Sequence, residues 1–482
     1  FTIRRQHRAA PLSVRLGFTS MSSLAALSGS RNLEENLLHP SDLAEAARTR
    51  QPSILSPRKR LRSRGTLLLV RTVAAISRGS RPPMLKSIPS VMEPEQQNSY
   101  AAAELTVPPP ALLDGSRRML AGNRLYVLLV AVPVALAAKP LGCSDGVVFG
   151  LCCFGILPLA ALLGDATEQV ALHTNETLSG LLNATFGNAT ELIVAICALN
   201  RGLLAVVQTS LLGSILSNTL LVLGCACLAG GVVTPAPHFN TVAAISNAAL
   251  LQIAVLGLLL PTIMHYAKDD MDFMQPLSHG ISIGLLLLYL LYIYFQLFTH
   301  HFLFEAPLEG DKSLREKELE EDDEDEEDEV LLSFSGGLLW LGIATVAIAF
   351  LSEELTGALE PAAAAWGLPQ AFVGFCLLPI VGNAAEHSTA IVCAYKQKMD
   401  LALGVALGSS TQIALFVIPV MVVIGWVIQQ PLDLFFGPFP TAVTFLSTNL
   451  VFMVVQNGET NWLEGAMLLF SYAIICFSFL FY

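Results

Sequence analysis

The sequence predicts an all-α polytopic membrane protein with about eleven transmembrane helices, one leading helix followed by two inverted repeats of five. Of its 482 residues, 53% are hydrophobic and only 14% are charged. Many apolar stretches reach the roughly 20 residues that cross a bilayer as a helix. The pentapeptide Gly-Asn-Ala-Thr-Glu at 187–191 returns 195 residues later as Gly-Asn-Ala-Ala-Glu at 382–386, and the same offset relates Gly-Ser at 213–214 to Gly-Ser at 408–409. The chain therefore contains a duplicated unit.

The first 119 residues are predicted to be disordered. Residues 1–90 hold 16 Lys and Arg against 4 Asp and Glu. A segment that is rich in Arg and Ser and poor in acids is typical of an organelle transit peptide. Because the chain begins with Phe1 and not with Met, translated leader sequence is an equal alternative for these residues. The following tail carries three consecutive prolines at 108–110, which block regular structure.

The leading helix is expected within 120–140, the first repeat within 141–304 and the second within 331–482. Each repeat holds five helices, and because five is odd the second repeat must enter the membrane from the opposite side. Inverted repeats of this kind are typical of secondary transporters. The expected helices lie near residues 125–138, 146–163, 177–199, 203–228, 242–264, 280–298, 331–358, 370–395, 401–428, 440–456 and 462–481.

An acidic segment at 305–330 separates the repeats. Residues 305–329 hold 15 acids against 3 bases, and a run of like charges is usually a solvated linker. A helix or a cation-collecting surface at the pore mouth are the alternatives. Cytosolic loops are enriched in Lys and Arg, which favours a cytosolic N-terminus and puts the linker in the cytosol. This orientation places Arg117, Arg118, Arg124, Lys396 and Lys398 on the cytosolic side and Lys139, Arg201 and Lys268 on the other.

Charge and motif content narrow the class of function. Outside the two charged blocks the chain carries 8 bases against 20 acids. The membrane part is therefore short of cationic partners for its carboxylates, which favours cations from solution. The sequence contains no Walker A motif, P-type phosphorylation motif or HExxH zinc motif. We expect neither an enzyme nor a cofactor nor a nucleic-acid partner, and the sequence predicts no oligomeric state.

Glu191 and Glu386 are the strongest candidates for a site. Each lies in a membrane-length apolar segment, where an ionisable group costs several kcal/mol unless it is partnered. A protonated Glu bonded to a neighbouring helix is the structural alternative, but the duplication favours one site built by both repeats. Ca²⁺ prefers oxygen ligands and often binds two carboxylates together with carbonyls and water. The pair therefore predicts a site for a hard cation, surrounded by membrane lipid.

The residues that precede each Glu fit this prediction. Gly187 and Gly382 lie one helical turn earlier, where the lack of a side chain can bare a backbone carbonyl toward an ion. Asn188 and Asn383 add amide oxygens, or donors that hold the empty carboxylates. In each repeat the amide and the carboxylate are three residues apart, which puts them on one face of a helix.

A second polar layer lies on the following helices. Ser214 belongs to the repeated Gly-Ser pair, and the offset aligns Ser217 with Gln412. Close helix packing alone could explain small residues such as serine, but it explains Gln412 less well. His387 follows Glu386 directly and points to another face, so a capping or packing role is favoured over proton relay.

A third layer is acidic and contains Glu168 and Glu353. We expect at least one of them to lie at membrane depth, away from the central pair. Proton handling and an interfacial salt bridge are equal alternatives for these two residues.

Four segments resemble the CAX family, the Ca²⁺/H⁺ exchangers of vacuolar-type membranes. Leu-Leu-Asn-Ala-Thr-Phe-Gly-Asn-Ala-Thr-Glu-Leu at 181–192 is similar to the first repeat motif of that family, and Leu-Pro-Ile-Val-Gly-Asn-Ala-Ala-Glu-His at 378–387 to the second. The segments at 210–218 and 404–409 match as well, as does the acidic linker. The resemblance covers the chain from about residue 120 to the end.

The resemblance implies one leading helix plus two inverted five-helix repeats, and it implies that Glu191 and Glu386 bind Ca²⁺. It also implies supporting roles for carbonyls near Gly187 and Gly382, for the polar positions Ser214 and Gln412, and for the outer acids Glu168 and Glu353.

The predicted function is exchange of cytosolic Ca²⁺, with other divalent cations as alternative substrates, for lumenal protons by alternating access. The expected location is a vacuolar or other acidic-organelle membrane. Glu191 and Glu386 would couple the two ions because protons and Ca²⁺ compete for the same oxygens, with Glu168 and Glu353 as further proton-handling candidates. A Na⁺/Ca²⁺ exchanger and a cation channel with a carboxylate filter are the alternatives.

Overall fold

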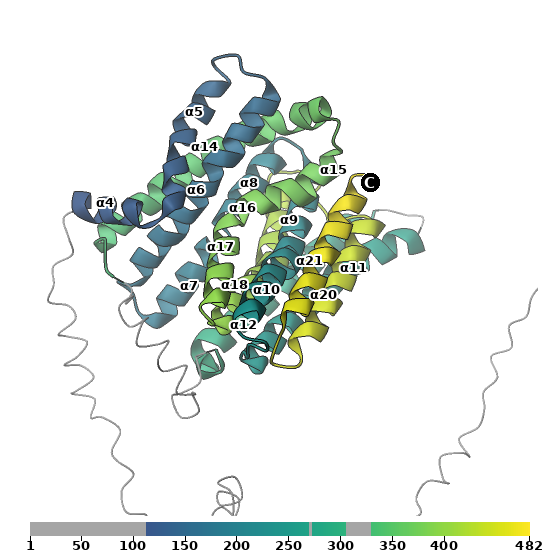
Figure 1. Ribbon diagram of the computed structural model, residues 1–482. Helices are drawn as coiled ribbons and strands as arrows, with labels where there is room; N and C mark the ends of the chain where they lie inside the picture. The colour runs from purple at the N-terminus through teal and green to yellow at the C-terminus, as the bar shows by residue number, and fades with distance from the viewer. Residues whose placement is uncertain (1–111, 269–271, 305–328) are drawn as a thin grey trace, which may run out of the picture. The chain divides into compact units, whose positions relative to one another are not determined.

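The computed structural model describes residues 112–268, 272–304 and 329–482 (Figure 1). Most of the N-terminal region and of the acidic linker, for which disorder and solvation were predicted, therefore lies outside the described residues. Within the described part, nine helices are long and apolar enough to cross a membrane, and two bent helix pairs bring the number of candidate spans to eleven. The predicted all-α membrane fold with about eleven spans is confirmed.

The described chain before the linker forms thirteen helical segments. In order they are α4 (Leu112–Gly122), the 3₁₀ helix η1 (Arg124–Val130), α5 (Ala131–Ala138), α6 (Asp145–Ala171), α7 (Glu176–Phe186), α8 (Ala189–Asn200), α9 (Leu204–Leu216), the π-helical turn η2 (Ser217–Val222), α10 (Leu223–Val233), α11 (Thr241–Ala267), α12 (Met274–Tyr294), the π-helical turn η3 (Phe295–Thr299) and the 3₁₀ turn η4 (His301–Leu303).

Ten further segments follow the linker. They are α14 (Phe334–Trp366), α15 (Gln370–Phe372), the π-helical turn η5 (Val373–Leu377), α16 (Leu378–Gly382), α17 (Ala384–Tyr395), α18 (Met399–Gln412), the π-helical turn η6 (Ile413–Val417), α19 (Ile418–Val427), α20 (Pro438–Val455) and α21 (Trp462–Phe479).

The prediction of disorder through residue 119 is wrong for residues 112–119, which form most of α4. Tertiary contacts explain this helix. A Cβ on Gly115 would lie 2.0 Å from the carbonyl oxygen of Leu331, so α4 packs directly on the backbone that leads into α14. Trp340 donates a hydrogen bond to Ser116 at 2.8 Å, and Met119 is buried. The chain then turns by 105° into η1 and α5, which form the leading span.

Two helices extend beyond their predicted ends. Helix α6 continues from residue 163 to Ala171 because Asp165, which interrupts the apolar pattern, accepts a hydrogen bond from the Tyr126 hydroxyl. Helix α14 continues from residue 358 to Trp366, through Pro361, and its last turns bury Ala362 and Ala363. A polar or helix-breaking residue in the sequence was therefore a poor marker of the helix end.

Helix pairing shows the inverted repeat. The first helices of the two repeats, α6 and α14, lie side by side along much of their length (Figure 1), and the fourth helices, α11 and α20, also pack together. The third helix of repeat one, α10, packs on the fifth helix of repeat two, α21. The fifth helix of repeat one, α12, packs on the third of repeat two, α19. This reciprocal pattern is what a two-fold relation between the repeats requires.

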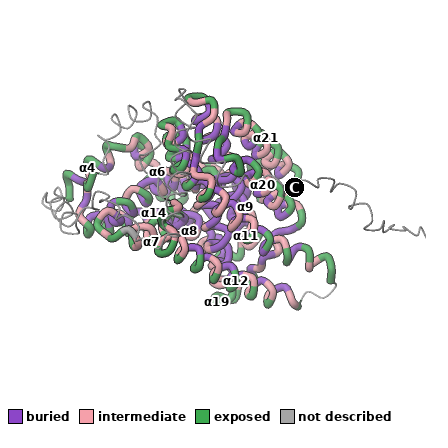
Figure 2. The backbone as a smooth tube through the Cα atoms, turned by 90° about the horizontal axis from the view of Figure 1, so that it is seen from below, coloured by how far each residue is buried: buried purple, intermediate pink, exposed green. Residues whose placement is uncertain are grey.

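The third span of repeat one lies at the centre of the bundle. Of the most hydrophobic 18 residues of this span, Leu204–Val233, 83% are buried. The corresponding share is 22% for Trp462–Phe479, which faces outward. Figure 2 shows buried residues gathered in the middle of the bundle around α9. Both third spans contain a π-helical turn, η2 and η6, and the 195-residue offset aligns the two turns. Because π-turns often mark functional sites, this matched irregularity points to the region beside them.

Candidate cation site

The second span of each repeat is broken where the repeated motif lies. Asn188 separates α7 from α8 with φ −109° and ψ 22°, and Asn383 separates α16 from α17 with φ −93° and ψ 13°. In the second repeat the two half-helices meet at a bend of 57°. Each break puts a glutamate, Glu191 or Glu386, in the first turn of a new helix. The positive end of a helix dipole favours a carboxylate there.

The two motifs face each other across the repeats. A Cβ on Gly382 would lie 3.4 Å from Glu191 Oε1, so the carboxylate of one repeat contacts the motif backbone of the other. Gly187 lies at the other break, where a Cβ would come within 2.7 Å of the Asn183 carbonyl oxygen. Both motif glycines are thus positions of close approach, although only Gly382 contacts a glutamate of the opposite repeat.

Three buried oxygens of the site have no hydrogen-bond partner among the described residues: Oε2 of Glu191, Oε2 of Glu386 and Oδ1 of Asn383. Buried oxygens without a partner are unusual in folded proteins, because losing water without gaining another bond costs free energy. The four ion pairs between described residues include neither glutamate. A cation that bound these oxygens would supply the missing partner.

Asn188 forms hydrogen bonds with two residues of the second repeat, Gln412 and Ser409. Asn188 Nδ2 donates to Gln412 Oε1 at 2.7 Å. The Ser409 hydroxyl lies 2.9 Å from Asn188 Oδ1 and 3.0 Å from Glu386 Oε1. Because a hydroxyl has one hydrogen, Ser409 donates to one of these two oxygens at a time. Gln412 therefore lies beside the motif amide of the first repeat, and Ser409 links the amide of one repeat to the carboxylate of the other.

Asn383 makes the corresponding contact with the first repeat. Its Nδ2 donates to Asn218 Oδ1 at 3.1 Å, and Asn218 Nδ2 donates to Ser409 Oγ at 3.0 Å. Each motif asparagine is thus bonded to the third span of the opposite repeat. The ring nitrogen Nε2 of His387 lies 3.0 Å from Ser217 Oγ, a further contact between the two repeats.

Ser214 lies beside Glu191. Both line a narrow cavity of about 30 Å³, which has room for a water molecule or two. Ser210 and Thr190 add hydroxyls, and the remaining lining is apolar apart from the motif backbone. The lining residues are Ile156, Thr190, Glu191, Val194, Ser210, Leu211, Ser214, Leu355, Leu378, Pro379, Val381 and Gly382.

The outer acids do not join the central pair. Glu353 is exposed and forms an ion pair with Arg201 at 2.6 Å, which is the salt-bridge alternative of the sequence analysis. Glu168 is exposed near the end of α6. Neither residue lines the cavity beside Glu191.

Two residues of the network, Asn218 and Ser409, were absent from the predicted ligand set. A signal for each was present in the sequence. Ser409 is the offset partner of Ser214, and Asn218 is an amide within a span of high hydropathy. Among the described residues, no group of three or more His, Cys, Asp or Glu side chains could hold a metal. The donors here are carboxylate, amide and hydroxyl oxygens, which suit a hard cation.

Comparison with known proteins agrees with this architecture. The sequence model of the family described as sodium/calcium exchanger protein matches residues 145–298 and 336–481, the two repeats. The chain belongs to this family.

Two named proteins are similar to this chain over about three quarters of its length. Vacuolar cation/proton exchanger 2 of Oryza sativa subsp. japonica is 44% identical over 376 residues, which cover 75% of this chain and 84% of that protein. The Ca²⁺/H⁺ antiporter of Synechocystis sp. is 42% identical over 361 residues, covering 74% and 96%. These names confirm the resemblance to cation/proton exchangers.

Solved structures show the same fold. The structure of native YfkE is 32% identical, with a TM-score of 0.62, and the match covers 74% of this chain and all of that one (100%). The crystal structure of the H⁺/Ca²⁺ exchanger CAX matches with a TM-score of 0.57 over 74% of this chain and 91% of that one, at 12% identity, and supports the fold alone.

Proposed function

We propose that this protein is a secondary antiporter that moves Ca²⁺ from the cytosol into an acidic compartment, such as a vacuole, in exchange for protons. One observation carries the proposal. Glu191 and Glu386 come from opposite repeats, lie at the breaks of two helices, and each keep a buried oxygen that has no hydrogen-bond partner in the described part of the chain. The names of relatives more than 40% identical, vacuolar cation/proton exchanger and Ca²⁺/H⁺ antiporter, support Ca²⁺ and protons as the exchanged ions.

The proposed Ca²⁺ ligands are oxygens of both motifs. Glu191 and Glu386 supply the charge, and Asn383 Oδ1 is a third oxygen that lacks a partner. Carboxylates supplemented by neutral oxygens are the usual Ca²⁺ environment. Further candidate ligands and supporting groups are the Asn188 amide, the Ser214 hydroxyl, the Gln412 amide and backbone carbonyls near Gly187 and Gly382.

Coupling follows from charge compensation. Two buried carboxylates that have no basic partner among the residues of the structure described above need positive charge, which either Ca²⁺ or protons can supply. The two ions therefore compete for one set of oxygens. If the site opens to one side at a time and the empty charged site does not reorient, each Ca²⁺ that leaves must be replaced by protons. The proton gradient then drives Ca²⁺ toward the acidic side.

In the proposed orientation the N-terminus and the acidic linker are cytosolic. The end of α8, the start of α9 and the end of α14 then face the acidic lumen. The excess of Arg and Lys at residues 117, 118, 124, 396 and 398 supports this orientation. Glu168 and Glu353 lie outside the central site, and any part they take in proton movement is on the way to it.

The proposal is tested with purified protein in sealed vesicles. An imposed pH gradient, acidic inside and without Na⁺, should drive uptake of labelled Ca²⁺, and a protonophore should abolish the uptake. Ca²⁺ uptake that survives collapse of the proton gradient with no other gradient present would indicate a channel. Uptake that requires an outward Na⁺ gradient would indicate Na⁺/Ca²⁺ exchange.

A further inference from the structure

Helices α8 and α14 share a seam that begins at the site. Val194 of α8 and Leu355 of α14 both line the cavity beside Glu191. Val194, Cys197 and Arg201 follow at intervals of three and four residues, so they lie on one face of α8. The cavity wall, a cysteine and a basic residue therefore follow one another along this face, toward the end of α8 that is lumenal in the proposed orientation.

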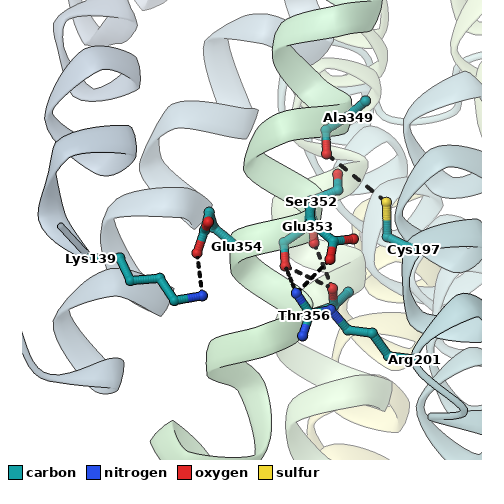
Figure 3. Close-up of polar contacts among 8 residues, drawn as sticks. All are labelled: Lys139, Cys197, Arg201, Ala349, Ser352, Glu353, Glu354 and Thr356. Carbon is teal, nitrogen blue, oxygen red and sulfur yellow. Dashed lines mark hydrogen bonds and ion pairs between the residues drawn. The ribbon is translucent and has the colours of Figure 1, made fainter.

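Two of these residues bind α14. The Cys197 thiol lies 4.0 Å from the carbonyl oxygen of Ala349. One turn further, Arg201 Nη2 donates to the Glu353 carbonyl oxygen at 3.0 Å and to Glu353 Oε1 at 2.6 Å (Figure 3). The two contacts are four residues apart on each helix, so α8 and α14 are joined at two successive turns. The outer contact is the stronger because it is charge-assisted.

Gly357 makes room for the arginine. A Cβ on this glycine would lie 3.0 Å from each of Cζ, Nη1 and Nη2 of Arg201, so the guanidinium group rests directly on the backbone of α14. A Cβ at residue 357 would require the guanidinium to shift by a few tenths of an ångström, and a larger side chain such as valine would push it further from the two oxygens of Glu353. Gly342, on the same helix, has open space around its Cβ direction and offers a matched comparison.

A second ion pair of α14 lies on the side of the helix that faces away from Arg201. Lys139, which follows α5, pairs with Glu354 at 2.8 Å (Figure 3). This pair joins α14 to the residue that follows α5 of the leading span. The adjacent acids Glu353 and Glu354 thus anchor α14 to two different neighbours, and only the Arg201 pair crosses the seam that leads from the cavity.

We propose that Arg201, resting on Gly357 and paired with Glu353, is a latch that keeps α8 against α14 and closes the lumenal route from the Glu191 cavity. The proposal rests on the proposed exchange function, because alternating access requires this seam to open when the site faces the lumen. The latch favours the closed state, so its removal shifts the population toward the open state. Both side chains of the pair are partly exposed, at 34% and 52%, so the expected shift is about two- to fivefold.

Cys197 is a natural reporter because it lies on α8 between Val194, which lines the cavity, and Arg201. The chain has nine cysteines, and a variant that keeps Cys197 alone is reconstituted and labelled from the lumenal side with a membrane-impermeant maleimide. Gly357→Val and Arg201→Gln should each raise the labelling rate about two- to fivefold. Gly342→Val and Lys139→Gln should leave the rate unchanged. Arg201→Gln changes no glycine, so it keeps the test valid if Gly357→Val does not fold.

Ca²⁺ uptake driven by a pH gradient is measured on the same preparations. Equal labelling of Cys197 in Arg201→Gln and in the parent variant, with the parent active in exchange, would overturn the latch and leave the proposed function standing. Absence of exchange in the wild-type protein would instead overturn the proposed function. Faster labelling in Lys139→Gln or Gly342→Val, to the same extent as in Gly357→Val, would also overturn the latch, because the effect would not be specific to the seam.

Discussion

At the scale of single residues, the site depends on atoms of opposite repeats that complete one another. Asn188 and Asn383 each donate to the third span of the other repeat, at 2.7 and 3.1 Å. Ser409 connects Asn188 to Glu386. Buried polar groups that satisfy one another in a network hold a single geometry, and the loss of one member leaves several unsatisfied.

Replacing either central carboxylate tests the charge at the site. Glu191→Gln and Glu386→Gln should each reduce pH-driven Ca²⁺ uptake to the level of empty vesicles, because an amide keeps the shape and removes the charge. Glu360→Gln, on the exposed face of α14, should leave uptake intact. Substantial uptake by a well-folded Glu191→Gln or Glu386→Gln protein would show that the two-carboxylate site is wrong.

The network itself is tested at Ser409. Ser409→Ala removes the partner of Asn218 Nδ2 and of one oxygen of Asn188 or Glu386. We expect a loss of about 1–3 kcal/mol in the free energy of unfolding, the usual cost of leaving buried polar groups unpaired. Ser410→Ala is the control because the shortest hydrogen bond of Ser410, 2.8 Å, goes to Ala406 in its own helix. Equal destabilisation of the two variants, measured by thermal unfolding in detergent, would argue against the network.

Sequence reasoning singled out Glu191 and Glu386 but missed Asn218 and Ser409 of the hydrogen-bond network. The two glutamates stand out because a duplicated carboxylate in an apolar segment is visible without structure. The bond from Asn218 to Ser409 joins residues 191 positions apart, and only the packing of two helices decides that they meet. Arg201 was used in the sequence analysis only to assign the orientation in the membrane. Its ion-pair partner, Glu353, is 152 residues away in the sequence and could not be identified there.

At the scale of elements, the segment between α19 and α20 is fastened to α9. Gln208 Nε2 donates to the carbonyl oxygens of Asp433 and Phe435, both at 3.1 Å, and to Asp433 Oδ1 at 3.2 Å. Asp433 Oδ1 also accepts from the Phe435 N–H at 3.0 Å. These bonds hold a loop over the start of α9, and they put a carboxyl group in a partly buried position outside the spans.

The loop predicts a pH dependence of stability. Burial raises the pKa of Asp433 above its ordinary value of 3.8, against the weaker opposite effect of its hydrogen bonds. The folded protein therefore binds this proton more tightly than the unfolded chain does. Asp433 should favour folding at acidic pH and lose this contribution as pH rises from about 4 through the raised pKa.

Thermal unfolding in detergent between about pH 4 and 7 tests this contribution. Asp433→Asn should lose less stability than the wild type as pH rises, since the amide does not titrate. If the unfolding temperatures of the two proteins changed with pH in parallel, Asp433 would not contribute to the pH dependence of stability. The acidic lumen, which this loop faces in the proposed orientation, is the side on which its protonated form is favoured.

Boundaries of elements were the weakest part of the sequence prediction. Hydropathy placed all eleven spans, because each apolar run is longer than the errors at its ends. Helix α4 was missed since its stability comes from contacts with the backbone near Leu331 and with Trp340, more than 200 residues later. The extension of α6 was missed because the partner of Asp165, Tyr126, lies on another helix.

At the scale of the whole molecule, the two repeats form one body whose halves pair reciprocally. The match of α10 with α21 and of α12 with α19 is the structural form of the duplication seen in the sequence. The end of the linker is tied to this body. Gln169 accepts hydrogen bonds from the N–H groups of Leu331 and Leu332 at 2.8 and 3.0 Å, and Arg118 pairs with Glu329 at 2.9 Å.

The acidic linker offers a prediction about Ca²⁺ capture. Replacing the nine acids at 320–328 by Gln or Asn, while keeping Glu329 and its ion pair, should raise the apparent Km for cytosolic Ca²⁺ at low ionic strength. A dense negative surface concentrates cations near an entrance, and salt screens this effect. The difference from wild type should therefore vanish at high ionic strength. An unchanged Km at low ionic strength would favour a linker without a role in capture.

The paired π-helical turns also affect how the chain tolerates a change in length. In η2 and η6 the backbone holds extra residues per turn compared with an α-helix, directly before α10 and α19. Deleting one residue from Ser217–Val222 or Ile413–Val417 would let the turn tighten to an α-helical one, so the helix that follows keeps its place. Deleting one residue from the middle of α10 or α19 would instead rotate the residues beyond the deletion by about 100° and shift them by about 1.5 Å, and their buried face would turn away from its partner, α21 or α12. A single-residue deletion inside α10 or α19 should thus be far more damaging than one at the turn before it.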